Sequence, residues 1–246
     1  MNPPRSLRLG LFGVSGKLGR RIASLALADP RFTLVAPLTY THSPHLGIDL
    51  GSLLGRAPLG LPLTAELQEE VDLLIDVSLP QGFVSRLALA LQHHLPLVLG
   101  TTNLSPTDLQ QLHAASAQIP LFYAVNFSLG MALMQQLSQI IAKHFPTAHM
   151  DLIETHHHTK KDAPSGSALR LSQAIQNALP ESPPIPIHSL RSGQIIGEHT
   201  LLFNTAEERL TLSHTVHSRD AFARGALESA LFLIQQSNGV YSMDDL

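Results

Sequence analysis

The sequence predicts an α/β protein in which a doubly wound parallel sheet is followed by an α+β region with a mostly antiparallel sheet. Strand-like and helix-like segments alternate through the first half of the chain, the pattern of a parallel sheet covered by helices. A glycine-rich loop joins the first strand to the first helix within a unit of about 30 residues. After about Asn126 this rhythm changes, and strands come to dominate.

The first half supplies the elements of the parallel sheet. Apolar runs typical of buried strands lie at 7–12, 32–38, 71–77, 96–100 and 119–125. Apolar residues at helical spacing occupy 17–28, 83–93 and 106–117. We expect Asp29-Pro30 to end the first helix and Ser105 to cap the third. The stretch 41–65 is rich in Gly, Leu and Pro and is expected to be a loop with weak structure.

The second half supplies the α+β region. Helices are predicted at 129–144, 167–179 and 219–236. Strands are predicted at 148–155, 187–191, 198–204 and 209–216, with a proline-rich linker at 181–186. Three of these strands follow one another directly after the linker, which favours antiparallel pairing.

Composition excludes several functional classes. The chain of 246 residues has a formal net charge of −3, so no basic surface for nucleic acid is expected. Cysteine is absent, which excludes disulfides, thiolate nucleophiles and cysteine-ligated metals. Residues 1–8 lack the apolar core of a signal peptide, and no window reaches about 18 continuous apolar residues. We therefore expect a soluble, cytoplasmic protein with no membrane partner.

The glycine-rich loop favours dinucleotide binding. Gly13, Gly16 and Gly19 form a GxxGxxG spacing between a strand and a helix. Glycines permit the tight turn and let the backbone approach a pyrophosphate, while the helix start offers N–H groups and a positive dipole end. A purely structural turn is the alternative, because such loops also serve packing.

The second strand favours NADPH over NADH. Sites that prefer NAD place Asp or Glu about 20 residues after the loop. Here Thr39 and Tyr40 occupy that place, and Lys17 could meet a 2′-phosphate. Alternatively, Lys17 is only a solvated lysine at a helix start.

Polar segments follow three later strands of the predicted parallel sheet. Ligands of such sheets lie beyond the carboxyl ends of the strands. Residues 76–78, 100–102 and 124–127 stand at such ends and could line the nicotinamide. Ordinary turn chemistry is the alternative.

The stretch 154–168 is the most informative segment. It contains three consecutive histidines, then Lys160 and a Pro-Ser-Gly turn before a helix. Ser165 can cap that helix, so that the N–H groups of Gly166 and Ser167 can bind an anion. His156, His157 and Lys160 add positive or donor character, and a small dicarboxylate fits this arrangement.

Zinc is the competing interpretation of the three histidines. Helical metal pairs need i, i+4 spacing, whereas adjacent histidines point in divergent directions. No metal is therefore expected, and a merely solvated histidine cluster is the other alternative. A Tyr-x-x-x-Lys pair and a GxSxG nucleophile elbow are both missing from the sequence.

An ordered set of motifs extends over nearly the whole chain. It comprises Gly100-Thr-Thr102, Asn126-Phe-Ser-Leu-Gly130, Glu154-x-His156-His157-x-x-Lys160-x-Asp162-Ala-Pro-Ser-Gly-Ser-Ala168, Gly193-x-x-x-Gly197-Glu198-His199, Ser218-Arg219-x-x-Phe222-Ala-x-Gly225-Ala226 and Gly239-Val-Tyr-Ser-Met243. The third motif is highly specific. In these motifs the sequence resembles the 4-hydroxy-tetrahydrodipicolinate reductase (dihydrodipicolinate reductase) family.

The resemblance implies a fold and an activity. It implies a Rossmann-like dinucleotide-binding domain formed by 1–127 and 217–246. An inserted α+β domain, 128–216, would bind substrate and build a homotetramer through its sheet. The implied reaction is reduction of 4-hydroxy-tetrahydrodipicolinate to tetrahydrodipicolinate, with loss of water, by NADPH or NADH in lysine and diaminopimelate biosynthesis.

The resemblance also implies roles for individual residues. His156 and Lys160 would handle protons, and the substrate carboxylates would be held by His157, Lys160, Gly166 and Ser167. Dinucleotide contacts are implied for Gly13, Val14, Ser15, Gly16, Lys17, Leu18, Gly100, Thr101, Thr102, Ala124, Val125, Asn126 and Phe127.

The sequence departs from the family at two points, and two other functions stay open. Ser167 stands where the family commonly has Thr, and the usual acidic residue after the second strand is missing. One alternative function is another Rossmann-fold imine or amino-acid dehydrogenase with a different acceptor. The other is a non-enzymatic dinucleotide sensor, which would need no proton donor.

Overall fold

The chain forms two compact units. The computed structural model describes residues 5–181 and 183–246. One unit comprises the chain up to Phe127 together with Phe222–Leu246, and the second comprises Ser128–Ala221. The second boundary is expected at 216/217, whereas the structure divides the chain at 221/222. Positions 1–4, within the segment considered for a signal peptide, and position 182 of the linker lie outside the described residues.

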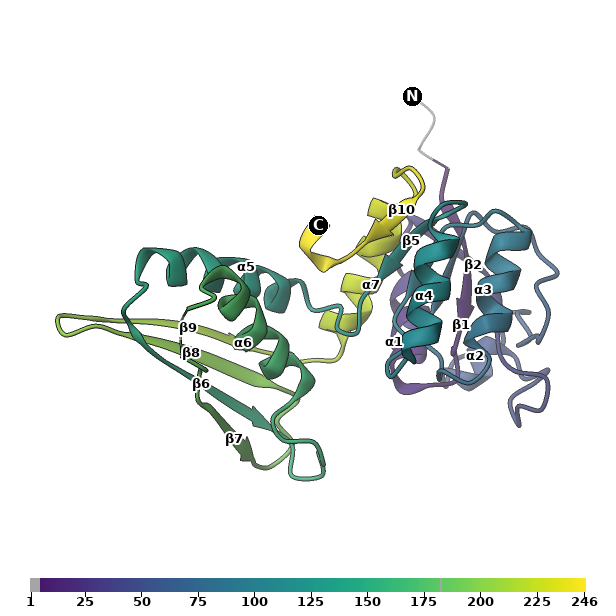
Figure 1. Ribbon diagram of the computed structural model, residues 1–246. Coiled ribbons are helices and arrows are strands. Elements are labelled where there is room, and N and C mark those ends of the chain that lie inside the picture. The colour runs from purple at the N-terminus through teal and green to yellow at the C-terminus, as the bar shows by residue number, and fades with distance from the viewer. Residues whose placement is uncertain (1–4, 182) are drawn as a thin grey trace. The chain divides into compact units, whose positions relative to one another are not determined.

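The first unit contains the predicted parallel sheet. Its six strands, among the described residues, have the order β10-β5-β4-β3-β1-β2 (Figure 1), and every neighbouring pair is parallel. They are β1 (Leu7–Phe12), β2 (Phe32–Leu38), β3 (Leu73–Asp76), β4 (Leu97–Leu99), β5 (Pro120–Tyr123) and β10 (Gly239–Tyr241). Strand β10 is not among the expected strands, because three residues are too few to show a period; it extends the sheet beside β5.

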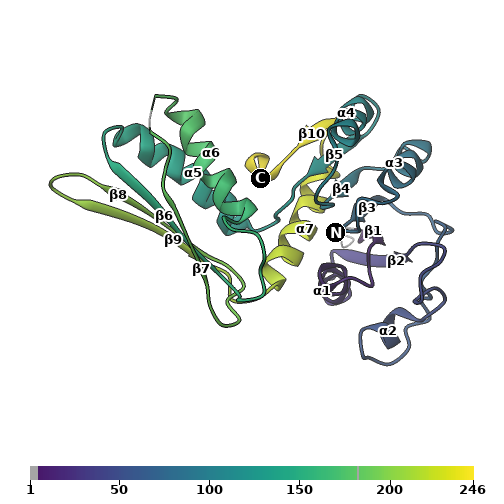
Figure 2. The same cartoon turned by 60° about the horizontal axis from the view of Figure 1, so that its bottom comes forward.

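Helices cover both faces of this sheet. They are α1 (Lys17–Ala26), α2 (Leu50–Leu53), α3 (Phe83–Gln92), α4 (Pro106–Ala115) and α7 (Asp220–Leu233), and a 3₁₀ turn lies at Met243–Asp245. Helices α1 and α7 supply small and branched residues to the core on one face, and α3 and α4 supply the core on the other (Figures 1 and 2). The doubly wound arrangement is therefore confirmed.

Side-chain caps explain where two of these helices begin. Ser105 caps α4 as predicted, and it forms a reciprocal capping box with Asp108. The stretch 41–65 was expected to be weakly structured, but α2 lies within it. The carboxylate of Asp49 accepts the N–H groups of Ser52, Leu59 and Leu61 at 2.9–3.2 Å and organises this segment. Composition alone does not reveal such a local network.

The second unit is an α+β structure. Its four described strands have the order β7-β6-β8-β9, with β7 parallel to β6 and the other pairs antiparallel. The elements are α5 (Leu129–His144), β6 (His149–His156), α6 (Gly166–Ala178), β7 (Ile187–Arg191), β8 (Glu198–Asn204) and β9 (Arg209–Thr215). The predicted mostly antiparallel sheet is confirmed.

Alternation along the strands fixes which face of this sheet is buried. Every second residue of β6 and β8 is buried, as expected for strands with one covered face. Met131 and Met134 of α5 and Leu171 and Ile175 of α6 pack against Leu152 of β6. Both helices lie on the same face of the sheet (Figure 2).

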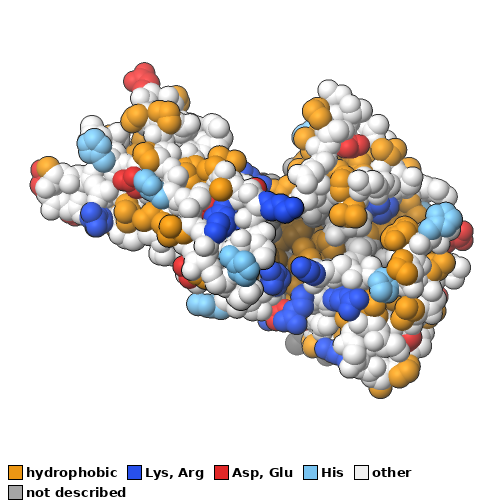
Figure 3. All heavy atoms as spheres, turned by 90° about the horizontal axis from the view of Figure 1, so that it is seen from below, with side chains coloured by type: hydrophobic (Ala, Val, Ile, Leu, Met, Phe, Trp, Pro, Cys, Tyr) orange, Lys and Arg blue, Asp and Glu red, His pale blue; other side chains and the backbone are white. Residues whose placement is uncertain are grey.

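Several apolar side chains of the second unit remain exposed in the isolated chain. On α5, Leu133 and Ile140 are 54% and 53% exposed, and on β7 Leu190 is 53% exposed. Orange side chains are visible among polar ones on the face drawn in Figure 3. Within the described part of the chain, every helix is too short or too polar to cross a bilayer.

The packing of α7 against the end of the first unit's sheet yields a prediction. A Cβ on Gly225 would lie 1.7 Å from the carbonyl oxygen of Phe127. Gly225→Ala should therefore lower the free energy of unfolding by about 1–3 kcal/mol through overpacking, despite the better helix propensity of alanine. Arg224→Ala, at an exposed neighbouring position, should change it little. Denaturant titration of both variants measures this, and equal stabilities would contradict the packing described.

Candidate functional site

The carboxyl ends of four strands meet at one edge of the first unit's sheet. Phe12 is the register partner of Asp76, Asp76 of Leu99, and Leu99 of Tyr123. The segments that follow these strands therefore lie next to one another. They include the glycine loop at 13–18 and the three segments expected to line the nicotinamide, 76–78, 100–102 and 124–127. Parallel sheets bind ligands at this edge.

The three glycines of the loop differ in their structural roles. Gly13 has a φ of 81°, and a Cβ there would lie 2.9 Å from the backbone of Val77 and Ser78. A Cβ on Gly19 would lie 2.1 Å from the carbonyl oxygen of Gly13. Both glycines are therefore needed by the fold itself. Gly16 is exposed at the start of α1, and its own N–H donates to the carbonyl oxygen of Gly13 at 2.9 Å. An anion such as a pyrophosphate would therefore meet the first N–H groups of the helix that follows Gly16.

The other loop residues divide into buried and accessible side chains. Val14 is fully buried in the core, so it can offer a ligand only its backbone. Lys17 is exposed, and Ser15 and Leu18 are half-buried.

The two later segments form a small-residue surface beside the loop. A Cβ on Gly100 would lie 2.5 Å from the ring of Phe127, which is itself buried. Thr101 is fully buried, and its hydroxyl has no hydrogen-bond partner among the described residues. A buried orphan hydroxyl at a strand end is suited to a ligand. Thr102 is exposed, Ala124 is buried, and Val125 and Asn126 are half-buried.

The region after β2 presents no accessible carboxylate for a ribose. Thr39 is buried and Tyr40 is 64% exposed. The first acid after them is Asp49, whose carboxylate is already bonded to three backbone N–H groups. These hydrogen bonds hold the pKa of Asp49 below its usual range against a smaller effect of burial.

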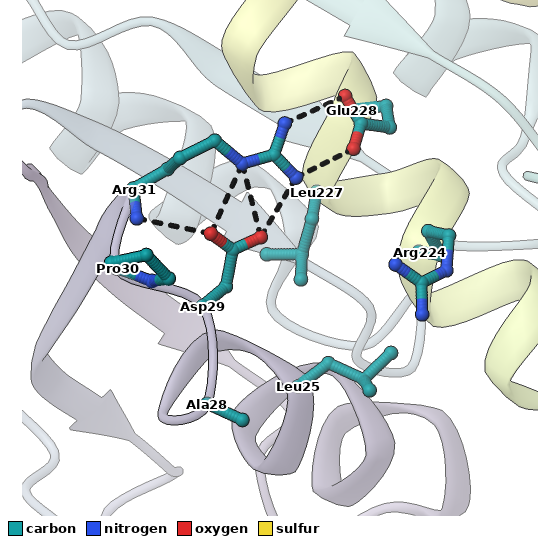
Figure 4. A pocket seen from close by; sticks show the side chains of 8 residues that line it. All are labelled: Leu25, Ala28, Asp29, Pro30, Arg31, Arg224, Leu227 and Glu228. Carbon is teal, nitrogen blue, oxygen red and sulfur yellow. Dashed lines mark hydrogen bonds and ion pairs between the residues drawn. The ribbon is translucent and has the colours of Figure 1, made fainter.

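A cavity of about 220 Å³ in the first unit lies elsewhere. It is lined by the end of α1, the turn before β2 and one side of α7 (Figure 4). Arg31 directly precedes β2, so the cavity is at the amino end of that strand, opposite to the edge described above. Asp29 and Glu228 both pair with Arg31 at 2.7 Å. This network, in which one guanidinium pairs with two carboxylates, stabilises the turn and differs from a dinucleotide site.

In the second unit, the buried face of strand β6 changes along the strand from apolar to ionisable side chains. Met150 and Leu152 are apolar core residues, and Glu154 and His156 follow on the same face. Glu154 has no exposed surface, and His156 is 8% exposed. A buried carboxylate is costly unless it is paired and hydrogen-bonded, so the partners of Glu154 determine the character of this site.

Glu154 has two cationic or proton-bearing partners. One carboxylate oxygen contacts Nδ1 of His156, and the other lies 2.9 Å from a guanidinium nitrogen of Arg191. Burial raises the pKa of Glu154, but the Ser189 hydroxyl, Arg191 and His156 outweigh it, so the net shift is downward. The carboxylate is therefore ionised at neutral pH.

His156 is neutral in the chain alone. Burial lowers its pKa, Glu154 opposes this, and the charges of Lys160 and Arg191 add to the lowering. Lys160, the other residue predicted to handle protons, follows the end of β6 by four residues, and its charge opposes protonation of His156. A negatively charged ligand here would raise the pKa of His156.

A second histidine connects this cluster to helix α6. The ring of His199 stands edge-on to that of His156, with centroids 5.3 Å apart. Burial lowers the pKa of His199 to about 4, so it too is neutral. Its Nε2 lies 3.4 Å from the hydroxyl of Ser165, which accepts the N–H of Ala168 at 3.2 Å. The predicted cap of this helix by Ser165 is therefore confirmed.

Lys160 is held by a neighbouring carboxylate. Its Nζ lies 2.8 and 2.7 Å from the two oxygens of Asp162. His157 is half-buried and its Nδ1 lies 2.7 Å from the Thr159 hydroxyl. At the helix start, Gly166 is exposed with open space where a Cβ would be, and Ser167 is half-buried.

The cluster also has the composition of a metal site. Ligand atoms of Glu154, His156 and His199 lie within 4.8 Å of one another. Arg191, however, already brings a positive charge to the same carboxylate, and this charge would repel a metal cation. The structure thus gives a physical reason for keeping the expectation that no metal binds.

Four residues that contribute to this site are not assigned a role from the sequence alone. Glu154, Asp162 and His199 stand in motifs of the sequence without an expected role, and Arg191 is only the last residue of an expected strand. The signal for Glu154 was available, since it continues the buried alternation of Met150 and Leu152. The pairing with Arg191 depends on strand register, which the sequence does not display.

Fold and site together define a class. A parallel sheet with a glycine loop at its ligand edge is typical of oxidoreductases that use a nicotinamide dinucleotide. Here this sheet is joined to an α+β unit that carries a buried glutamate–histidine pair.

The particular family follows from comparison with known proteins. Residues 7–127 match the family model described as "Dihydrodipicolinate reductase, N-terminus", and residues 130–246 match "Dihydrodipicolinate reductase, C-terminus". The chain belongs to the dihydrodipicolinate reductase family.

Relatives support this assignment over the full length. The 4-hydroxy-tetrahydrodipicolinate reductases of Burkholderia thailandensis and of Caldanaerobacter subterraneus subsp. tengcongensis are each 36% identical, covering 98% of this chain and 98% of theirs. A dipicolinate-bound dihydrodipicolinate reductase from Paenisporosarcina sp. TG-14 shares the fold, with a TM-score of 0.81 at 24% identity over 97% of this chain and 98% of that one. A myo-inositol dehydrogenase from Corynebacterium glutamicum is less similar in fold, with a TM-score of 0.63 at 15% identity over 96% of this chain and 90% of that one.

The different structural roles of Gly13 and Gly16 yield a prediction. At Gly16 an added Cβ meets only the carbonyl oxygen of Gly13, at 3.2 Å. Gly16→Val should therefore weaken NADPH binding at least about tenfold, since each 1.4 kcal/mol of lost contact is tenfold, while the thermal midpoint changes little. Gly13→Val should instead lower the thermal midpoint strongly. Calorimetric titration with thermal unfolding separates the two, and undiminished NADPH binding by Gly16→Val would contradict the loop assignment.

Proposed function

We propose that this chain reduces 4-hydroxy-tetrahydrodipicolinate to tetrahydrodipicolinate, with loss of water, and uses NADPH in preference to NADH. The observation that carries the proposal is full-length membership of the dihydrodipicolinate reductase family, combined with a buried imidazole beside a lysine. The reaction belongs to lysine and diaminopimelate biosynthesis.

His156 and Lys160 are proposed to handle the proton. Loss of water from the 4-hydroxy substrate leaves a conjugated ring. A bound nicotinamide dinucleotide would supply the hydride to one carbon of that ring, and the neighbouring carbon then needs a proton. The negative charge of a bound dicarboxylate raises the pKa of His156, which burial otherwise lowers. The substrate therefore converts a neutral imidazole into an acid when it arrives.

The substrate carboxylates are proposed to be held by His157, Lys160, Gly166 and Ser167. The start of α6 offers backbone N–H groups and a positive dipole end, and the open space before Gly166 admits a ligand. Lys160 now pairs with Asp162, which is exposed on 59% of its side chain. A substrate carboxylate can compete for that ammonium group, because an exposed ion pair is weak.

The dinucleotide is proposed to bind at the carboxyl edge of the first unit's sheet. Gly13, Val14 and Gly16 would let the backbone of the loop approach the pyrophosphate closely, with Ser15 and Leu18 flanking it. The nicotinamide would contact the small-residue surface made by Gly100, Thr101, Thr102, Ala124, Val125, Asn126 and Phe127. The orphan hydroxyl of Thr101 supports this placement.

The preference for NADPH rests on charge. No accessible carboxylate follows β2 within the described residues 39–48, so a ribose 2′-hydroxyl lacks its usual acceptor. Lys17 is exposed at the start of α1 and can pair with a 2′-phosphate.

The protein is proposed to act as a cytoplasmic homotetramer. Exposed apolar side chains in the second unit, among them Leu133, Ile140 and Leu190, are of the kind that subunit interfaces bury. Neither nucleic acid nor membrane is proposed as a partner, given the net charge of −3.

The decisive assay is oxidation of NADPH and NADH, followed by absorbance, with enzymatically generated 4-hydroxy-tetrahydrodipicolinate. We expect turnover with both and a higher kcat/KM for NADPH. Turnover with other imines or with amino acids, but not with this substrate, would favour a different dehydrogenase. Dinucleotide binding without any turnover would favour a sensor.

Lys160→Ala tests the proposed site within that assay. Loss of a proton-handling group should lower kcat by about 10²–10⁴-fold, while the Kd for NADPH stays unchanged. Lys161→Ala is the matched control, since Lys161 is an exposed neighbour with no proposed role. Equal turnover of the two variants would remove Lys160 from the mechanism.

A further inference from the structure

One buried ion pair reaches both proposed proton-handling residues. Glu154 contacts Nδ1 of His156 with one oxygen and lies 2.9 Å from Arg191 with the other. Arg191 comes from β7, where it is the register partner of His156 on β6. The N–H of Ser192 donates to the carbonyl oxygen of His156 at 2.8 Å, which ties the two strand ends together.

The same guanidinium also fixes the loop that carries Lys160. A nitrogen of Arg191 donates to the carbonyl oxygen of Asp162 at 2.5 Å. The carboxylate of Asp162 in turn binds Nζ of Lys160. A continuous set of contacts thus runs from His156 through Glu154, Arg191 and Asp162 to Lys160.

We propose that Glu154 and Arg191 form a positioning pair, which orients the imidazole of His156 and the loop of Lys160 as one unit for proton delivery. The roles of His156 and Lys160 rest on the proposed function. Glu154 and Arg191 act through these two residues.

The arrangement determines which nitrogen of His156 carries the proton at rest. Glu154 is ionised, so it can only accept, and the proton in its contact with His156 must lie on Nδ1. Nε2 is then the atom that gains a proton and delivers it. Beside Nε2 stands Gly197, where a Cβ would lie 3.2 Å away. Glycine at this position therefore leaves space next to the reactive nitrogen.

The charges around His156 favour this assignment. Glu154 stabilises the protonated form of His156, whereas the charges of Lys160 and Arg191 oppose its protonation. His199, packed edge-on from β8, is neutral. Removing the carboxylate of Glu154 should therefore make His156 a stronger acid and free its ring to turn.

The variant Glu154→Gln tests the pair in kinetics. It keeps the shape and removes the charge. We expect kcat to fall on the order of 10²-fold at neutral pH, as for a small misplacement of a reacting group, with the NADPH Kd within about twofold of the wild type. The alkaline limb of the pH profile of kcat/KM should move to lower pH, because the protonated imidazole is the form that acts. A purely structural role would lower the thermal midpoint without moving that limb.

A matched control lies on the same strand. Asp151 of β6 pairs with His188 of β7 at 2.9 Å on the exposed side. Asp151→Asn removes an aspartate–histidine pair between the same two strands but outside the cluster. Its kinetics and pH profile should match the wild type. An equal effect of both variants would overturn the proposal.

Nitrogen NMR of the wild-type holoenzyme tests the pair even if Glu154→Gln fails to fold. The resting imidazole of His156, assigned through His156→Gln, should carry its proton on Nδ1. A proton on Nε2 would overturn the proposal. Wild-type protein without reductase activity would count against the proposed function, whereas active wild type with an unaltered Glu154→Gln variant would count against the positioning pair alone.

Discussion

A carboxylate with no contact to solvent is the constraint around which the second unit is organised. Burying Glu154 is unfavourable unless both oxygens find partners. Arg191 and His156 provide them, and these partners come from two adjacent parallel strands. The sheet must therefore hold β6 and β7 in one register. That requirement also places the loop after β6, with Lys160, beside the imidazole.

The same region shows how an apolar core becomes a reactive site over a few residues. Met150 and Leu152 bury hydrocarbon, and Glu154 and His156 continue their alternation. The desolvation that stabilises the core there lowers the pKa of His156. A low dielectric also strengthens interactions with an incoming anion. The imidazole is consequently neutral without ligand and responsive to a dicarboxylate.

The sequence predicted the fold well where the period of the apolar residues was clear. The strand of 7–12 and the helix of 129–144 agree with β1 and α5 to the residue. Two short elements could not be predicted in this way. Strand β10 is three residues long, and α2 is organised by the carboxylate of Asp49. Tertiary contacts decide such elements.

The candidate site was only partly predictable for a related reason. His156 and Lys160 stand in one segment, where spacing and a following helix start suggest anion chemistry. Arg191 and His199 reach that segment from other strands, and pairing register cannot be derived from a single sequence. The loop glycines illustrate the same limit, because only the structure separates Gly13, which packs on backbone, from the accessible Gly16.

The most direct measurement of this account is the number of protons taken up when a dicarboxylate binds. Calorimetric titration of the wild-type protein with pyridine-2,6-dicarboxylate, in buffers of different ionisation enthalpy, gives that number at neutral pH. The account predicts net proton uptake in the wild type, because the ligand raises the pKa of His156, and little or none in His156→Gln. Tight binding with no uptake, or the same uptake in both proteins, would contradict it.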